Sequence, residues 1–271
     1  MPAVQGLARC AIIHAYPLCS TGPMLRNCVL LAVFTLSTLA QASNDRALPA
    51  VDVGLIATGE FRYTTSLVLG ETELEIESTR RLGFEDDEQG ERILVVETIT
   101  RTGMGDTTER LELDAVSLMP KKQRVDQGDS VLNADYTASQ VTGMIRAAGQ
   151  VVPIDLKLDA PAYGGEAALE AMLVALPLAS GYRTQVRAME IDVEQLVRRF
   201  AVVVEERETI EVPAGEFDTW RLRLDALDGL GGSQIMWIGV DAPRLLVRAK
   251  GFIPEEVGQG SLITELTRWD P

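Results

Sequence analysis

Between residues 164 and 178 the apolar positions recur with the period of an α-helix. Four large apolar side chains occupy positions i, i+3, i+4 and i+7: Leu169, Met172, Leu173 and Leu176. This spacing places them in one stripe along a helix. Only Glu166 and Glu170 are polar, and alanine or valine fills the remaining circumference, which is typical of a helix that is buried on most sides. Gly164 precedes this predicted helix and Pro177 ends it.

From residue 55 onward, the rest of the chain has the period of two that indicates β-strands. Segments such as 58–69 and 92–102 are rich in Thr, Val, Ile and Leu, and glycine-containing turn signals separate them. The segment 92–102 begins apolar on both faces, which predicts a central strand that is covered on both sides.

We count about eleven or twelve strands, and no repeat or linker requires a second domain within residues 55–271. The pattern predicts a mainly β fold, a single antiparallel curved sheet, half-barrel or barrel with one helix packed against it. A helix of about 18 Å matches the width of about four strands, so it can lie across one face of the sheet.

Three segments carry hairpin and strand signatures that point to a family. They are Leu176-Pro177-Leu178 with Gly181, the run 212–222, and Trp237-Ile238 with Asp241 and residues 243–248. These segments look like the exported bacterial family catalogued as domain of unknown function 3108, and the likeness covers most of residues 55–268. The resemblance implies a periplasmic, β-rich protein and supplies no catalytic residues. The expected architecture is also similar to the half-barrels of periplasmic lipoprotein carriers.

The first 42 residues contain the three parts of a secretory signal peptide. Residues 24–27 are short and basic, residues 28–39 are apolar to neutral, and Ala40-Gln41-Ala42 is a small-x-small cleavage site. We therefore expect cleavage near Ala42 and Ser43, a periplasmic mature protein, and a flexible leader over residues 43–54. The apolar run spans about 18 Å, short of a bilayer core of about 30 Å, so no transmembrane span is expected in the mature chain.

Residues 1–23 fit no part of a signal peptide. We interpret them as an over-extended start that precedes the true initiator, Met24.

Removal of the signal segment changes the available chemistry. It contains all three cysteines, Cys10, Cys19 and Cys28, and the one histidine, His14. Ser-His-Asp and Cys-His catalysis, thiol chemistry and ordinary zinc or copper sites are then excluded. The loss of two arginines leaves 23 basic against 40 acidic residues, a net charge of −17. That charge argues against nucleic acid and anionic lipid as partners, and we expect no cofactor and no metal site.

Several polar segments have both a functional and a structural interpretation. The run Glu85-Asp86-Asp87-Glu88 offers oxygen ligands for Ca²⁺, but it lacks EF-hand spacing, and we interpret it as a solvated hairpin turn. A pair of carboxylates about 5–9.5 Å apart suffices for glycoside hydrolysis, but the sequence cannot select one pair among 40. Ser233 lacks a nucleophile elbow and a histidine, so we interpret it as a turn residue.

Two tryptophans and two arginines follow the predicted helix. Trp220 and Trp237 flank one turn, and we expect them to face each other, either in the core or along an apolar cavity beneath the helix. Arg244 and Arg248 share one face of the next predicted strand, where they pair with local carboxylates or meet an anionic headgroup. The candidate ligand-binding residues are Leu169, Ala171, Met172, Leu173, Leu176, Trp220, Trp237 and Arg244.

The leading hypothesis is a periplasmic, non-enzymatic binding or carrier protein for a hydrophobic or amphipathic ligand, such as a lipid or a lipoprotein. The alternative is an envelope structural or assembly factor that acts through protein–protein contacts, with the helix completing a dry core. A carboxylate-dependent hydrolase is a third hypothesis. The alanine-rich flank of the helix, residues 167–175, separates the first two, because small side chains allow either close packing or a cavity wall.

Overall fold

The computed structural model describes residues 47–103, 105–191, 196–228, 233–253 and 260–271. Within these residues, fifteen strands form one sheet around a single α-helix, α2 (Gly165–Ala175), which is preceded by a short 3-10 helix, η1 (Val53–Leu55). The predicted mainly β fold with one helix is confirmed. The strands are β1 (Gly59–Leu69), β2 (Thr72–Asp86), β3 (Arg92–Thr102), β4 (Gly105–Asp114), β5 (Pro120–Gln127), β6 (Ser130–Tyr136), β7 (Gln140–Ala147), β8 (Gln150–Lys157), β9 (Tyr163–Gly164), β10 (Arg183–Glu190), β11 (Leu196–Val212), β12 (Gly215–Ala226), β13 (Ser233–Gly239), β14 (Leu246–Ile253) and β15 (Gly260–Asp270).

The strand order follows the chain, with one long-range junction. Strands β1 to β8 run outward on one side and β15 back to β9 on the other, so the first and last strands pair in the middle of the sheet. That antiparallel pairing extends from Glu60 opposite Asp270 to Leu69 opposite Gly260. The two-residue strand β9 pairs parallel with β10, and the other pairs are antiparallel. Most strands therefore pair with the strand that precedes or follows them in the sequence, as the turn signals predicted.

The described residues contain more strands than the sequence indicated. Strand β5 was not predicted because it opens with Pro120 and two lysines and has no apolar alternation. Strand β9 has only two residues, too few to produce a pattern. Both segments gain their strand conformation from pairing with neighbours. In β3, by contrast, residues 93–96 are all buried, as predicted for a strand that is covered on both faces.

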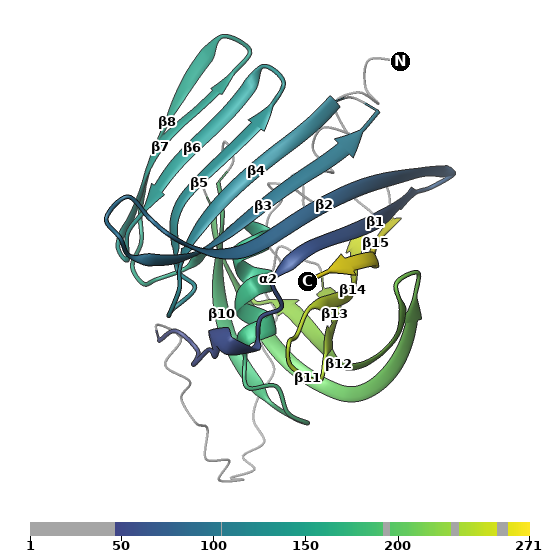
Figure 1. The fold of residues 1–271 in the computed structure, drawn as a ribbon. Helices are drawn as coiled ribbons and strands as arrows, with labels where there is room; N and C mark the ends of the chain where they lie inside the picture. The colour runs from purple at the N-terminus through teal and green to yellow at the C-terminus, as the bar shows by residue number, and fades with distance from the viewer. Residues whose placement is uncertain (1–46, 104, 192–195, 229–232, 254–259) are drawn as a thin grey trace, which may run out of the picture.

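Helix α2 lies inside the curved sheet and forms the centre of the main core. Residues 167–175 of the helix are all buried. They pack against inward-facing side chains of both halves of the sheet, including Leu94, Leu111, Val202 and Leu222. Burial of Leu169, Met172 and Leu173 on the helix, and of Leu176 directly after it, contributes about 6–12 kcal/mol at about 1.5–3 kcal/mol each. In Figure 1, α2 lies at one end of strands β3–β6, which continue beyond it.

The sheet coils until its two ends approach one another. A separate apolar cluster joins Val141 on β7 and Ile154 on β8 to Met189 on β10. The carboxylate of Asp159 also pairs with the guanidinium of Arg187 on β10. These contacts explain the barrel-like shape, because β8 and β9 are the two edges of the sheet among the described residues.

The hairpin of β11 and β12 curls to form a further apolar cluster, which we call the second core. A register shift between Val204 and Glu206 bends β11, and the Ala214 amide at the hairpin tip donates to the Leu266 carbonyl at 3.1 Å. Ile210 and Val212 thereby pack against aromatic residues of β1 and β13. This arrangement gives the molecule a second core that is distinct from the one around α2.

The expected flexible leader is shorter than the sequence suggested. Leu48, Val51 and Val53 pack against the main core, and the Asp52 amide donates to the Ala175 carbonyl at 2.8 Å. These apolar residues are ordered because they cover the end of α2. The predicted signal peptide and residues 43–46 lie outside the described residues. Within the part of the chain that the structure describes, no helix is long and apolar enough to cross a membrane.

Candidate functional site

Polar side chains from five strands and α2 gather inside the sheet around the first turns of the helix. We call them the interior polar cluster: Tyr63, Arg80, Glu109, Gln123, Tyr136, Glu166 and Glu170. The strands supply them at positions that alternate with outward-facing residues, so polar groups occupy places where apolar side chains normally lie. A polar group in such a place requires a partner, because desolvation without one is costly.

The centre of the cluster is an ion pair between the helix and the sheet. The Arg80 guanidinium on β2 pairs with the Glu170 carboxylate on α2, and their side chains are only 14% and 10% exposed. The same guanidinium lies 5.4 Å from the centre of the Tyr63 ring, a cation–π distance. The Tyr63 hydroxyl donates to the Leu246 carbonyl at 3.2 Å, and burial raises the pKa of this tyrosine. Arg80 is therefore fixed from two sides.

A hydrogen-bonded chain holds the start of the helix. The Tyr136 hydroxyl donates to Gln123, whose amide nitrogen donates to the Glu109 carboxylate at 2.7 Å. The Tyr136 ring also lies against Gly164, where an added Cβ would be only 2.7 Å from a ring carbon. Glycine at this position is thus required by close packing, and the contact links the helix start to β4, β5 and β6.

The cluster is short of positive charge. Three carboxylates, those of Glu109, Glu166 and Glu170, lie near Arg80, which forms an ion pair with Glu170 and lowers the pKa values of the other two from farther away. Burial raises the pKa of Glu109, and the Gln123 hydrogen bond and Arg80 oppose that rise only partly. Part of Glu166 is accessible to water, but desolvation raises its pKa as well, and the neighbouring carboxylates of Glu170 and Glu109 add to that rise while Arg80 opposes it. Both carboxyls therefore hold a proton more tightly than glutamates on an open surface do.

Two small cavities border this cluster. One, of about 20 Å³, lies beneath α2 and is lined in part by Tyr63, Arg80, Glu170, Ala171 and Arg244. The other, of about 40 Å³, lies beside Glu166, with apolar walls that come mainly from β13, β14 and β15. A single water needs about 10–15 Å³ on this measure, whereas ligand pockets commonly have about 300–1,000 Å³. The first cavity accommodates one water molecule and the second a few.

The predicted ligand-binding residues of the helix are core residues. Met172, Leu173 and Leu176 are fully buried, and Leu169 is nearly so. Of the candidate ligand-binding residues on the helix, Ala171 lines the small cavity beneath it. The structure thus brings the helical candidates together as a packed core.

The predicted pairing of Trp220 with Trp237 is wrong. In the register of β12 and β13, Trp220 lies opposite Ile238, and Trp237 lies opposite Arg221. Adjacent strand positions point to opposite faces, so the two indoles lie on different sides of the sheet. Trp220 packs on the core around α2, whereas Trp237 belongs to the second core and donates its indole N–H to Glu208 at 2.6 Å.

Arg244 and Arg248 also separate in the structure. The Arg244 guanidinium donates to the Leu176 carbonyl at 2.9 Å and to the Val240 carbonyl at 3.1 Å, so it caps the C-terminal end of α2. A cation there also complements the helix dipole. Arg248 pairs with Glu265, as the local-pairing interpretation predicted. Its guanidinium lies 5.7 Å from the Trp237 ring centre.

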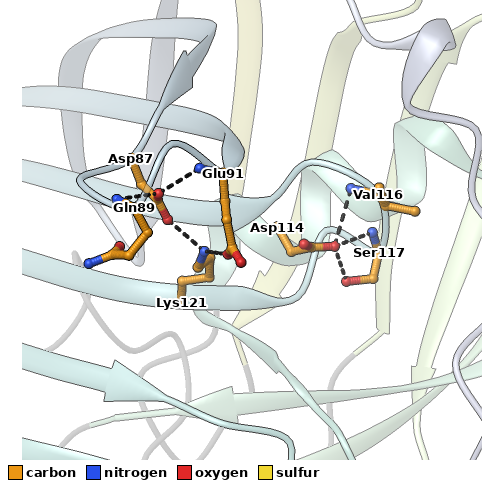
Figure 2. Close-up of polar contacts among 7 residues, drawn as sticks. All are labelled: Asp87, Gln89, Glu91, Asp114, Val116, Ser117 and Lys121. Atoms are coloured by element: carbon orange, nitrogen blue, oxygen red, sulfur yellow. Dashed lines mark hydrogen bonds and ion pairs between the residues drawn. The ribbon is translucent and has the colours of Figure 1, made fainter.

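The acidic run before β3 forms a structured turn. The Asp87 carboxylate accepts hydrogen bonds from the amides of Gln89 and Glu91, both at 2.9 Å, and pairs with the Lys121 ammonium at 2.7 Å (Figure 2). These bonds, of which the one from Lys121 is the strongest influence, lower the pKa of Asp87. Glu85 instead pairs with Arg110. The carboxylates of the run are thus divided between separate partners, which supports the hairpin-turn interpretation.

A second turn beside this one is held in a similar way. The Asp114 carboxylate accepts from the amides of Val116 and Ser117 and from the Ser117 hydroxyl, as Figure 2 shows. Together the two turns fix the end of the β2–β5 meander near the start of β5. They are structural features of the rim and lie apart from the interior polar cluster.

Sequence reasoning did not find the strand residues of the cluster. Arg80 has the same strand phase as Leu82 and Phe84, and Glu109 the same phase as Leu111 and Leu113. A charged residue in the apolar phase of an amphipathic strand was the available signal. It did not reveal that α2 would supply the partners, because that depends on how the sheet curves.

Comparison with known proteins places this fold in a family. The family model "Protein of unknown function (DUF3108)" matches residues 62–267. The chain belongs to this family. The match runs from the first strand to the last, so the whole sheet and α2 are features of the DUF3108 region.

Two solved structures resemble this DUF3108 protein. A beta-barrel-like protein of the DUF1849 family from Brucella abortus has a TM-score of 0.51 at 12% identity, covering 83% of this chain and 99% of its own. A Bacteroides fragilis protein with a YmcC-like fold has a TM-score of 0.35 at 11% identity, covering 80% of this chain and 97% of its own. The first likeness supports a barrel-like fold and nothing about activity. No curated protein matches the sequence significantly.

Proposed function

We propose that this DUF3108 protein is an exported, non-enzymatic factor of the cell envelope that works by binding another protein. The observation that carries this proposal is the filled interior. Helix α2 occupies the place where a carrier would hold its ligand, and the adjoining cavities measure about 20 and 40 Å³. A lipid tail needs far more room, so the envelope-factor hypothesis is favoured over the carrier hypothesis.

The packing of the helix supports this choice. Its alanine-rich flank makes close contacts, and its charged Glu170 is used in the pair with Arg80. A helix that moved aside for a ligand would break this ion pair and leave both charges without their partner, at a cost of about 3–5 kcal/mol. The structure therefore favours a helix that stays in place.

The chemistry of the interior gives no support to the hydrolase hypothesis. A glycosidase needs two carboxyls with a substrate between them. The cavity beside Glu166 has about 40 Å³, too little for a sugar ring with its attacking water. Export to the periplasm is proposed from the signal-peptide features of residues 24–42.

Native mass spectrometry of the protein prepared from the periplasm of a bacterial host tests the proposal. The expected mass is that of the chain from Ser43 onward, with no adduct after incubation with mixed phospholipids. A stoichiometric adduct of lipid mass would overturn the proposal and restore the carrier hypothesis. A mass that includes residues 24–42 would contradict export with cleavage at the predicted site.

A further inference from the structure

The concave wall of the sheet continues beyond α2 as a row of half-buried apolar side chains. Val125 on β5 lies opposite Leu132 on β6, which lies opposite Ile145 on β7, which in turn lies opposite Val152 on β8. We call these four residues the inner apolar row. Each is half-buried, and each is β-branched or leucine, so together they form a continuous apolar strip across four strands.

The register shows that this row is on the same face as α2. Glu109, which lies opposite Val125, bonds Gln123, and the Gln123 amide lies close to Gly165 at the start of the helix. One step nearer the helix, Ala134 and Ile154 are fully enclosed in the core. At the row itself, one step farther from the helix, the wall is partly accessible to water, although Leu132 and Ile145 also pack against this enclosed cluster. In Figure 1 the strands extend past the end of α2 in this direction.

The charges at the end of the row are negative. Glu109 ends the row on β4, and the Glu166 carboxylate on α2 is close enough to that of Glu109 for the two to repel each other. Of the cations near these carboxylates, Arg80 is already paired with Glu170, and Lys250, which lines the cavity beside Glu166, lies over the Phe252 ring. An apolar strip that ends at two carboxylates is complementary to a segment that has apolar side chains on one face and lysine or arginine beside them.

We propose that the inner apolar row, with Glu109 and Glu166, docks a basic amphipathic segment of a partner protein. This inference rests on the proposed function and names its surface. The sheet already binds one apolar helix, α2, on this concave face, and the row extends that face by one further step. A second copy of this chain is a poor occupant, because its mature charge of −17 would bring like charges together.

A peptide-binding assay with matched variants tests this surface. The probe is a fluorescein-labelled peptide of about 18 residues, with leucine at helical spacing and lysine elsewhere. Its dissociation constant is measured by anisotropy with the full mature protein. Ile145→Lys, on the row, is compared with Met144→Lys, its neighbour on the outer face, which is 40% exposed. Both variants add one positive charge, so each changes the non-specific electrostatic attraction of the peptide to the acidic protein by the same amount.

The expected result is that Ile145→Lys weakens binding about tenfold or more, while Met144→Lys changes it by less than about twofold. If Ile145→Lys fails to fold by circular dichroism, Val152→Lys and Val151→Lys provide the same comparison on β8, where Val151 faces outward and is 57% exposed. Equal weakening by the inner and outer variants overturns the proposal, and so does a lack of binding.

Glutamine variants test the contribution of the two carboxylates to binding. The double variant Glu109→Gln with Glu166→Gln should weaken binding of the lysine peptide severalfold, whereas Glu73→Gln with Glu75→Gln, exposed on β2, should not. A control peptide with glutamate in place of lysine should bind poorly. Two results contradict this partner class. One is equal binding of the lysine and glutamate peptides, and the other is displacement of the lysine peptide by dodecylamine. Even after such a result, native mass spectra free of lipid would still support the proposed function as an envelope factor.

Discussion

The Arg80 guanidinium on β2 forms an ion pair with the Glu170 carboxylate of α2, and both side chains are largely shielded from water. Strands β3 to β9 lie between these two residues along the chain. The pair links the helix directly to the sheet, and removal of either partner would leave the other charge buried without its partner. It therefore provides the most direct test of how α2 is held.

Replacement of Glu170 by glutamine should lower the free energy of unfolding by about 3–5 kcal/mol, since it leaves the buried Arg80 charge without its partner. Urea unfolding followed by circular dichroism measures this loss. Glu60→Gln, which disrupts exposed pairs with Arg62 and Arg81, serves as the control and should leave the midpoint nearly unchanged. Recovery of stability in the double variant Arg80→Met with Glu170→Met would support the unpaired-charge explanation, and a small loss in Glu170→Gln would refute it.

Stability should depend on pH through Glu109 and Glu166. Burial raises the pKa of both, so the folded protein binds their protons more tightly than the unfolded chain does. Their contribution to the free energy of unfolding therefore increases as the pH falls from neutral through the raised pKa values. It becomes constant below the ordinary glutamate value of 4.5.

The difference in unfolding free energy between the wild type and Glu109→Gln with Glu166→Gln isolates this effect. It should shift in favour of the wild type as the pH falls from about 8 to about 5. The outer pair Glu73→Gln with Glu75→Gln removes the same charge and is the control. Parallel pH curves for the wild type and the inner variant would show that the two carboxyls have ordinary pKa values.

Gly164→Ala should destabilise the start of α2. The added methyl group would lie 2.7 Å from a carbon of the Tyr136 ring, which is buried and held by its hydroxyl, so the helix or the strand must shift. We expect a loss of about 1–3 kcal/mol in unfolding free energy, typical of overpacking. Gly103→Ala, with no atom near its Cβ position, is the matched control. Equal stability of the two variants would mean that Tyr136 adapts freely.

Ala171→Trp tests whether the space beneath the helix is as small as about 20 Å³. An indole exceeds this volume several times, so the variant should lose about 1–3 kcal/mol or more, or fail to fold. Thermal unfolding of this variant and of Val116→Trp, on an exposed turn, gives the comparison. A normally stable Ala171→Trp protein would reveal a larger cavity and would favour the carrier hypothesis again.

The sequence alone determined the local elements. The spacing of Leu169, Met172, Leu173 and Leu176 predicted a buried helix, and the structure has it at Gly165–Ala175. Alternation and turn residues predicted most strands and their pairing with sequence neighbours, because short turns leave antiparallel strands little choice of partner. The family resemblance was also available from the sequence, and the matched model confirms it.

Only the tertiary structure decided which of these elements meet and on which face. The pairing of β1 with β15 joins residues about 200 positions apart, and no local pattern encodes it. A shift of one residue in register sends Trp220 and Trp237 to opposite faces. Likewise, the period of a strand shows that Arg80 and Glu109 share a phase with apolar residues, but the coiling of the sheet is what brings that phase against α2. Curvature and register arise from packing over the whole sheet, which is why the sequence did not show that the residues of the interior polar cluster meet.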